Sequence, residues 1–257
     1  MSNPIGDRLR GSSAFYALRD IYRFSFKHSL WMAAVARTHF YRQFVRPGDL
    51  VFDVGANEGE YARSFLALGA RVVSCEPQPH CIRLLRTIRN KGFSLEPVAI
   101  GASFGRVTMR ICSDDGMSSL SEDWIELLGK RYRNRSWGAP IDVPMVTLDS
   151  IISKYGEPEF IKIDVEGYES QVLSGLSYMP RGLSFEVNHE WMDAARKCLE
   201  WSHFGPDVRF NWFFGASPTQ LDSPRWISRE EMIAVTKTAE FADRMEPCDI
   251  IAVRNPN

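Results

Sequence analysis

The stretch that decides the fold is Leu50–Tyr61, which reads LVFDVGANEGEY. Its apolar run ends at an acid, Asp53, and the glycines Gly55 and Gly59 follow. Glycine adopts positive φ and lets backbone approach a neighbour closely, so the pattern predicts a buried strand, a tight turn and then a helix. Open α/β sheets bind their ligands beyond the carboxyl ends of the strands. The stretch therefore predicts the class of fold and the place of a ligand.

The residues around this turn favour S-adenosylmethionine (SAM) over a dinucleotide. A dinucleotide site carries G-x-G-x-x-G, whereas this chain has G-x-x-x-G preceded by the carboxylate of Asp53. A carboxylate disfavours a phosphate group and suits SAM, which has an ammonium and a sulfonium and no phosphate. Glu76 follows the next expected strand, at the place where an acid hydrogen-bonds ribose hydroxyls. Asp53, Gly55 and Glu76 together predict a SAM site.

Three segments resemble the FkbM-type methyltransferases, a SAM-dependent family. They are VFDVGANEGEY (51–61), VSCEP (73–77) and FIKIDVEGYESQVLSG (160–175), and the resemblance covers roughly Asp49–Asn188. It implies an α/β class: the Rossmann-like class I methyltransferase fold, with a seven-stranded mixed sheet and helices on both faces. It also implies methyl transfer to oxygen, on a hydroxyl of a sugar, a glycolipid or a natural product such as a polyketide.

Hydrophobic periodicity extends the expected fold along the chain. Beyond the first strand, the expected strands are Arg71–Cys75, Phe93–Ile100, Arg106–Cys112, Val143–Val146, Phe160–Asp164, Leu183–Val187, Val208–Phe214 and Asp249–Val253. The expected helices are Glu60–Leu68, His80–Asn90, Tyr168–Leu176, Trp191–His203 and Glu230–Lys237, with another that ends at Tyr155. The last strand is expected to pair with the one before it, as a late antiparallel hairpin.

The N-terminal part is expected to be a separate helical extension. Residues 1–45 form this extension, packed on the core, and residues 46–257 form the methyltransferase domain. Ala14–Phe44 is rich in aromatic residues at three- and four-residue steps. Covering the edge of the sheet is the preferred role; a lid, a dimer face and an amphipathic helix on a membrane are the alternatives.

Composition narrows the functional classes. Thirty-one basic and 32 acidic residues give a net charge of −1, so no nucleic-acid partner is expected. The five cysteines form no C-x-x-C pair, which favours buried free thiols in a reducing compartment over a zinc site. The start of the chain lacks the apolar core of a secretory signal, and no apolar run approaches a membrane span. A soluble, cytoplasmic protein is expected; its oligomeric state is open.

Strand ends and the resemblance together give a set of expected cofactor contacts. The set is Asp53, Gly55, Asn57, Gly59, Tyr61, Glu76, Pro77, Ala99, Ser118 and Asp164. Ala99 stands where the adenine lies in folds of this type. Ser118 opens a Ser-Ser-Leu segment that matches one in the family. Its alternative role is that of an ordinary loop serine.

A hydroxyl acceptor must lose a proton, which requires a general base near the transferred methyl group. Asp164, Glu166 and His189 lie at expected strand ends and are the candidates. Lys162, two residues before Asp164, lies on the same face of its strand and is expected to pair with it. Asp164, Glu166 and Glu186 could also hold a divalent metal, but their spacing does not demand one, and none is predicted.

Two loops are expected to set acceptor specificity. Ser113–Ser121 is polar, and Trp124–Trp137 is basic and aromatic; the second is interpreted as a substrate loop or a solvated face, with aromatic rings available to stack on a sugar. The principal alternative function is a non-catalytic SAM-binding or scaffold protein that retains the fold. A nicotinamide oxidoreductase is disfavoured because G-x-G-x-x-G is missing.

Overall fold

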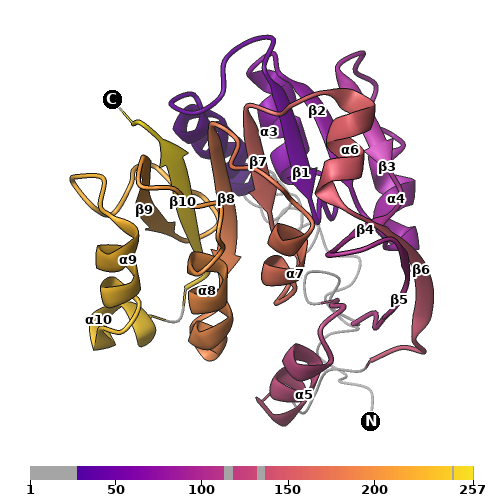
Figure 1. Ribbon diagram of the computed structural model, residues 1–257. Coiled ribbons are helices and arrows are strands. Elements are labelled where there is room, and N and C mark those ends of the chain that lie inside the picture. Colours follow the sequence, from indigo (N-terminus) through magenta and orange to yellow (C-terminus); the bar gives the residue numbers. More distant parts are fainter. Residues whose placement is uncertain (1–27, 113–117, 132–136, 245, 257) are drawn as a thin grey trace, which may run out of the picture.

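The computed structural model describes residues 28–112, 118–131, 137–244 and 246–256, and shows a sheet of seven strands (Figure 1). In spatial order the strands are β3 (Phe93–Glu96), β2 (Arg71–Cys75), β1 (Leu50–Val54), β7 (Phe160–Ile163), β8 (Gly182–Val187), β10 (Cys248–Arg254) and β9 (Val208–Phe214). The first five run parallel, and β10 is antiparallel to both β8 and β9. This order confirms the expected class I methyltransferase sheet and its antiparallel hairpin.

The centre of the sheet follows from its apolar strands. Every residue of β1 is buried, including Asp53, and every residue of β7 is buried, including Lys162. Val51 of β1 pairs with Val72 on one side and with Phe160 on the other. Parallel strands covered on both faces are normally apolar throughout. Because a buried charge is unfavourable unless it is paired, Asp53 and Lys162 on these strands indicate a candidate functional site.

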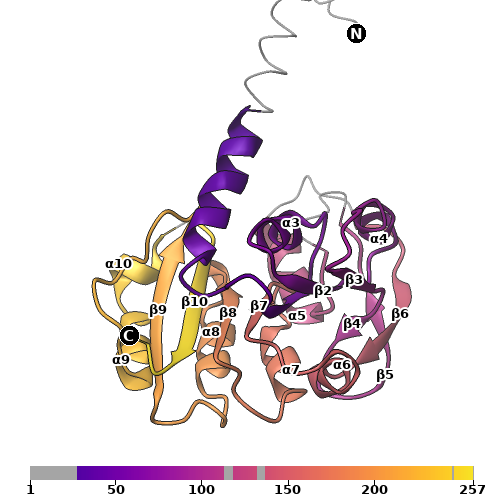
Figure 2. The same ribbon diagram turned by 90° about the horizontal axis from the view of Figure 1, so that it is seen from above.

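Helices cover both faces of the sheet (Figure 2). Within the described ranges and after β1, the helices are α3 (Glu60–Ala67), α4 (Pro79–Leu85), α5 (Glu122–Arg131), α6 (Leu148–Tyr155), α7 (Glu169–Ser174), α8 (Met192–Leu199), α9 (Arg229–Val235) and α10 (Ala239–Ala242), with a 3₁₀ turn η2 (His189–Trp191). In Figure 2, α3 and α4 lie on one face and α6, α7 and α8 on the other. None of the helices within the described ranges is long and apolar enough to span a bilayer.

A second, three-stranded sheet corrects the expectation for Phe93–Ile100. That stretch splits into β3 and β4 (Ala99–Ile100), and β4 joins β6 (Ile141–Val146) and β5 (Gly105–Met109). Pro97 separates the two strands; it has no backbone N–H to continue a ladder, so the chain leaves the first sheet there. The break carries Ala99 toward the carboxyl ends of the central strands.

Two further segments differ from expectation. The helix after β2 ends at Leu85 and not at Asn90. The start of Trp124–Trp137 is the helix α5, in which Trp124 is buried and not part of a solvated face. Residues 1–27, 113–117 and 132–136, on which the other expectations for the N-terminus and the two loops fall, lie outside the described residues. All five cysteines are buried free thiols, as expected.

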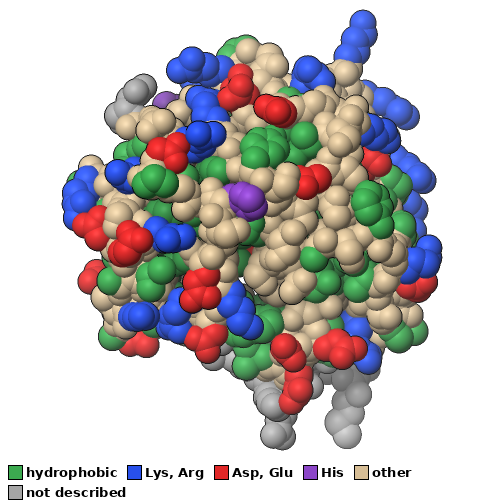
Figure 3. Space-filling view, in the orientation of Figure 1, with side chains coloured by type: hydrophobic (Ala, Val, Ile, Leu, Met, Phe, Trp, Pro, Cys, Tyr) green, Lys and Arg blue, Asp and Glu red, His purple; other side chains and the backbone are tan. Residues whose placement is uncertain are grey.

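Residues 28–41 form a helix whose last turn packs on a face of the sheet, where it contacts the edge strand β9 and the central strand β7. Phe40 lies 4.8 Å from Phe213 between ring centroids, and Phe44 stacks on Phe160 at 5.6 Å. Phe160 starts the central strand β7, so the contact is with the middle of the sheet. Elsewhere charges of both signs intersperse over the face seen in Figure 3.

These contacts predict that Phe40 contributes to the stability of the whole protein. Phe40→Ala empties a site that is 2% exposed, and the expected loss in the free energy of unfolding is about 3–5 kcal/mol. Phe104, which is 69% exposed, provides the control, because Phe104→Ala is expected to change stability by less than about 0.5 kcal/mol. Urea unfolding measures both. Equal effects of the two changes would contradict the packing of this helix on the core.

Candidate active site

The turn after β1 brings two strand ends into direct contact. Gly55 has φ +80°, and a Cβ added there would lie 1.7 Å from the carbonyl oxygen of Asp164. The Asp164 N–H donates to the Val54 carbonyl at 2.9 Å, which locks the turn after β7 against β1. Only glycine permits both this φ and this approach. The glycine that the sequence marks therefore joins the turns that follow the two central strands.

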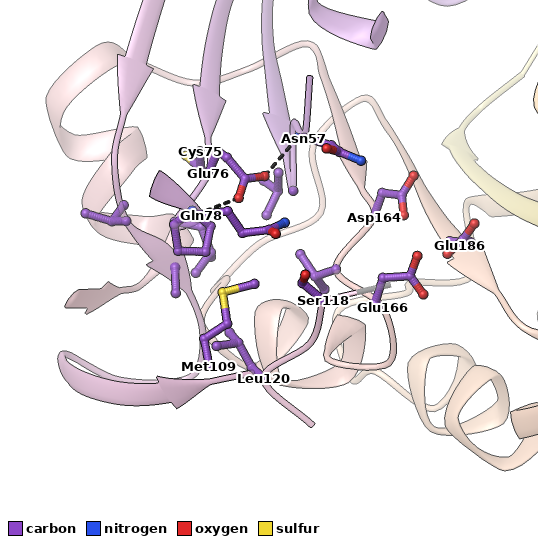
Figure 4. A pocket seen from close by; sticks show the side chains of 17 residues that line it. Asn57, Cys75, Glu76, Gln78, Met109, Ser118, Leu120, Asp164, Glu166 and Glu186 are labelled. Atoms are coloured by element: carbon purple, nitrogen blue, oxygen red, sulfur yellow. Dashed lines mark hydrogen bonds between the residues drawn. The ribbon is translucent and has the colours of Figure 1, made fainter. Parts of the chain in front are cut away.

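A cavity of about 190 Å³ opens beside this junction (Figure 4). Its lining residues come from the carboxyl ends of β1, β2, β7 and β8, from the second sheet and from the segment that precedes α5. They are Val54, Gly55, Asn57, Cys75, Glu76, Pro77, Gln78, Val98, Ala99, Ile100, Met109, Ser118, Leu120, Asp164, Val165, Glu166 and Glu186. The cavity lies where an open α/β sheet binds its ligand.

Glu76 is fixed at one end of the cavity by backbone donors. One carboxylate oxygen accepts from the Asn57 N–H and the other from the Gln78 N–H, each at 2.8 Å. Burial raises the pKa of Glu76 to about 7, although the two backbone hydrogen bonds oppose this rise. Both carboxylate oxygens still have acceptor capacity, so Glu76 can receive hydrogen bonds from a pair of hydroxyls.

Three carboxyl groups converge at the other end of the cavity (Figure 4). Asp164, Glu166 and Glu186 can each offer an oxygen within 4.8 Å of the others. Burial, followed by the charge of Asp164, raises the pKa of Glu166 and of Glu186 well above the ordinary value. The group forms a carboxyl-rich end to the cavity, here called the acidic end, in which Glu166 and Glu186 retain a proton more readily than isolated carboxyl groups do.

A buried lysine lies behind this acidic end. The ammonium of Lys162 lies 3.1 Å from Asp164, as the sequence predicted, and 2.9 Å from Asp249 of β10. Burial opposes its charge, but the two carboxylates outweigh this effect and raise the pKa of Lys162 well above the ordinary value. The Tyr61 ring lies under the same ammonium, at 4.9 Å from its centroid. Lys162 therefore stays charged and fixes one oxygen of Asp164.

The turn after β7 is held from outside the cavity. Glu169 accepts from the N–H groups of Val165 and Gly167, both at 3.1 Å. The Ser119 hydroxyl donates to the Glu166 carbonyl at 2.6 Å. Glu166 itself has φ +54° and directs its side chain into the cavity. Glu169, and not the side chain of Glu166, therefore holds this turn in place.

The cavity gathers most of the residues expected at the cofactor. Gly55, Asn57, Glu76, Pro77, Ala99, Ser118 and Asp164 all line it, and Glu166, expected only as a candidate base, lines it as well. Ser118 also accepts from the Cys112 N–H at 3.0 Å, so its hydroxyl oxygen is partly used within the protein.

Four expected residues do not line the cavity. Asp53 is buried behind it, and burial raises the pKa of its carboxyl to about 7. Tyr61 lies between Arg37 and Lys162 in the layer of helices. A Cβ on Gly59 would lie 2.7 Å from Leu85, which gives this glycine a packing role against α4. His189 lies in η2, beyond the end of β8.

Sequence reasoning missed several lining residues. Gln78 provides a backbone donor to Glu76, and Met109 and Leu120 form an apolar wall. No local pattern marks Met109 or Leu120, because the second sheet brings them to the cavity. Trp124 was expected on a loop where its ring could stack on a sugar, but it is buried and stacks on Trp191 at 5.9 Å. Its face is therefore occupied by protein.

Comparison with known families identifies this arrangement. The family model described as Methyltransferase FkbM domain matches residues 53–216, more than half of the chain. The chain belongs to the FkbM methyltransferase family. The matched region is accordingly a SAM-dependent methyltransferase domain, and the cavity at its strand ends is the candidate site for SAM.

Individual relatives of this FkbM methyltransferase are distant. It is 30% identical over 147 residues to the 2-O-methyltransferase NoeI of Sinorhizobium fredii, a match that covers 51% of this chain and 58% of that protein. A precorrin-6y C5,15-methyltransferase from Geobacter metallireducens is 10% identical, with a TM-score of 0.42 and coverage of 86% of this chain and 87% of that one. The plantazolicin methyltransferase BpumL with SAH is 10% identical, with a TM-score of 0.43 and coverage of 96% and 92%.

The chemistry of the cavity fits SAM. Its described lining residues include Glu76, Asp164, Glu166 and Glu186 and contain no Lys, Arg or His. Such a lining disfavours phosphate and attracts the ammonium and sulfonium of SAM. The apolar wall of Val98, Ile100, Met109 and Leu120 suits the adenine.

The contact of Gly55 with Asp164 gives a test of the site's assembly. Gly55→Ala is expected to abolish SAM binding in calorimetric titration and to destabilise the protein by about 3 kcal/mol or more, because it combines strained φ with a backbone clash. Gly215 has φ +83° and no neighbour within 4 Å of an added Cβ, so Gly215→Ala carries the φ strain alone. That control is expected to cost about 1–2 kcal/mol and to bind SAM normally. Similar behaviour of the two variants would argue against the close approach.

Proposed function

We propose that this FkbM methyltransferase transfers the methyl group of SAM to a hydroxyl oxygen of a sugar, glycolipid or natural-product acceptor. The observation that carries the proposal is the convergence of Asp164, Glu166 and Glu186 at one end of a cavity that has Glu76 at the other. A hydroxyl needs a proton acceptor beside the reacting methyl group, and this end supplies carboxylates. The relative named as a 2-O-methyltransferase supports transfer to oxygen.

The difference between the two ends of the cavity suggests the orientation in which SAM would bind. Glu76 would accept hydrogen bonds from the ribose hydroxyls, and Ala99 with its apolar neighbours would hold the adenine. Asn57 and Pro77 would flank the ribose, while Gly55 would allow close approach of the amino acid part. Ser118 would close the adenine side. Bound SAM supplies an already activated methyl group, so the protein's task is largely to position the acceptor.

The acidic end would then receive the acceptor's proton. Asp164 is held by Lys162 and is the first candidate for the base. Glu166 is the second, because its carboxyl lines the same end of the cavity as Asp164. His189, beyond β8, is the third and would act from the acceptor's side. The proposal assigns no metal to the three carboxylates, so EDTA is expected to leave turnover unchanged.

The assignment of Glu76 to the ribose predicts a pH-dependent affinity. With a pKa of about 7, Glu76 is mostly protonated at pH 6 and mostly ionised at pH 8. The ionised carboxylate is the better acceptor, so affinity for 5′-methylthioadenosine should rise about tenfold over this range. This ligand has ribose and adenine but no ammonium or carboxylate of its own to titrate. Calorimetric titration at several pH values measures the slope.

Two variants distinguish the carboxylates responsible for that slope. Glu76→Gln should weaken binding and remove the pH dependence. Asp53→Asn should keep the slope, because Asp53, whose pKa is also about 7, lies behind the cavity. A slope that persists in Glu76→Gln and disappears in Asp53→Asn would reverse the assignment.

The base assignment predicts that binding and turnover separate. Asp164→Asn is expected to lower kcat by about 10²–10⁴-fold, while the Kd for SAM changes less than about tenfold; the same loss in His189→Gln, with an active Asp164→Asn, would make His189 the base. Turnover is measured as SAH formation with a panel of hydroxylated glycosides, and product mass gives the methylated site. Asp142→Asn is the control, since this carboxyl is 58% exposed on β6. Full turnover in both variants would leave Glu166 as the base.

A further inference from the structure

The outer half of the helix over residues 28–41 is apolar and exposed. Leu30, Trp31, Met32 and Val35 are 47%, 59%, 49% and 44% exposed. Among the residues that the structure describes, Phe104 is the one other large hydrophobic side chain with comparable exposure. Figure 2 shows this helix extending away from the rest of the molecule. Such a concentration within one short segment, here called the apolar segment (residues 30–35), indicates a binding surface.

A groove of about 500 Å³ lies beside the apolar segment, between this helix and α3. Trp31, Ala34 and Val35 form its apolar side on the helix, and Ala67 contributes from α3. Arg42 and Arg63 supply its charges, and no acidic side chain lines it. The helix groove thus combines apolar surface with two guanidinium groups, the pair of features that suits an anionic amphiphile.

The charge of this region stands out from that of the whole chain. Residues 21–48 include no Asp or Glu, although the net charge of the protein is −1. The Arg37 guanidinium forms an ion pair with Glu60, with 2.6 Å between Nη2 and Oε2. Arg42 and Arg63 are exposed and line the groove. An anionic partner is therefore favoured.

We propose that the apolar segment and the helix groove bind the surface of a bilayer that contains anionic phospholipids. Leu30, Trp31 and Met32 are consecutive, so they point in three directions around the helix, about 100° apart. A protein partner covers one face of a helix, whereas fluid acyl chains can surround it. Trp31 suits the interface between the acyl chains and water, where tryptophan is enriched, and Arg42 and Arg63 would contact the lipid phosphates.

A second copy of the chain is a poorer match for this surface. Two copies joined through the same patch would bring their helix grooves together. Each groove carries Arg42 and Arg63 and no acidic side chain, so the four guanidinium groups would repel one another. The proposal concerns location at a membrane and is independent of which group the methyltransferase modifies. It would place the enzyme beside amphiphilic acceptors.

Vesicle flotation with the full chain tests the proposal. Vesicles of phosphatidylcholine with about 30% phosphatidylglycerol are expected to carry the protein, vesicles of phosphatidylcholine alone are not, and salt should weaken binding. The triple variant Leu30→Gln, Trp31→Gln, Met32→Gln is expected to lower partitioning at least about tenfold, because it removes the apolar contact. Phe104→Gln is the matched control and should bind as the natural chain does.

The guanidinium contribution has its own pair of variants. Arg42→Gln with Arg63→Gln should lower partitioning about tenfold or more. Arg225→Gln with Lys237→Gln removes two exposed cations near the ends of α9 and should have little effect. Unchanged circular dichroism and unchanged SAM affinity show that each variant is folded.

Two results would overturn the proposal. One is a dimer by light scattering that the triple variant dissolves, with no vesicle binding by the natural chain; the surface would then bind a second copy. The other is a monomer that binds no anionic vesicles, in which case the surface does not serve a membrane, and residues 1–27 of the same chain become the candidate cover.

Discussion

The site depends on one buried charge, the ammonium of Lys162. It lies fully buried in β7, 2.9 Å from Asp249 and 3.1 Å from Asp164, so it ties the parallel half of the sheet to the antiparallel hairpin. Burying such a charge is unfavourable unless it is paired, and removal of one partner from a buried pair typically costs about 3–5 kcal/mol. The same contact fixes the orientation of the carboxylate that faces the cavity. Fold stability and the geometry of the acidic end of the cavity therefore depend on the same ion pairs.

Close backbone approach forms the second constraint. Gly55 permits the turn after β1 to touch the turn after β7, and a Cβ on Gly167 would meet Trp191 at 2.8 Å and Trp124 at 3.1 Å. The two glycines thus let the turn after β7, which carries Asp164 and Glu166, pack closely against its neighbours on both sides. Close packing restricts where these carboxyl groups can lie.

The sequence predicted the central strands better than it predicted the second sheet and the helix α5 beside the cavity. Leu50–Asp53 and Phe160–Asp164 are apolar runs with one acid at the end, and such runs identify strands without tertiary information. The break at Pro97 and the burial of Trp124 in α5 were missed. Both depend on partners distant in the chain: β6 draws β4 into a second sheet, and Gly167 makes room for the stacked tryptophans. The role of Glu169, which accepts from the backbone of the turn after β7, was not predicted from the sequence and became visible only in the fold.

The sequence by itself determined where the central strands lie along the chain, the cofactor class and the acids at the strand ends, because local periodicity, glycine placement and strand-end chemistry are encoded by neighbouring residues. Tertiary structure alone decided which of the expected residues reach the cavity. It brought Asp164, Glu166 and Glu186 together, as the sequence had suggested, but it withdrew Asp53, Gly59, Tyr61 and His189 from the cavity lining and introduced Asp249 as the second partner of Lys162. These outcomes depend on register between strands far apart in the chain, which no local pattern specifies.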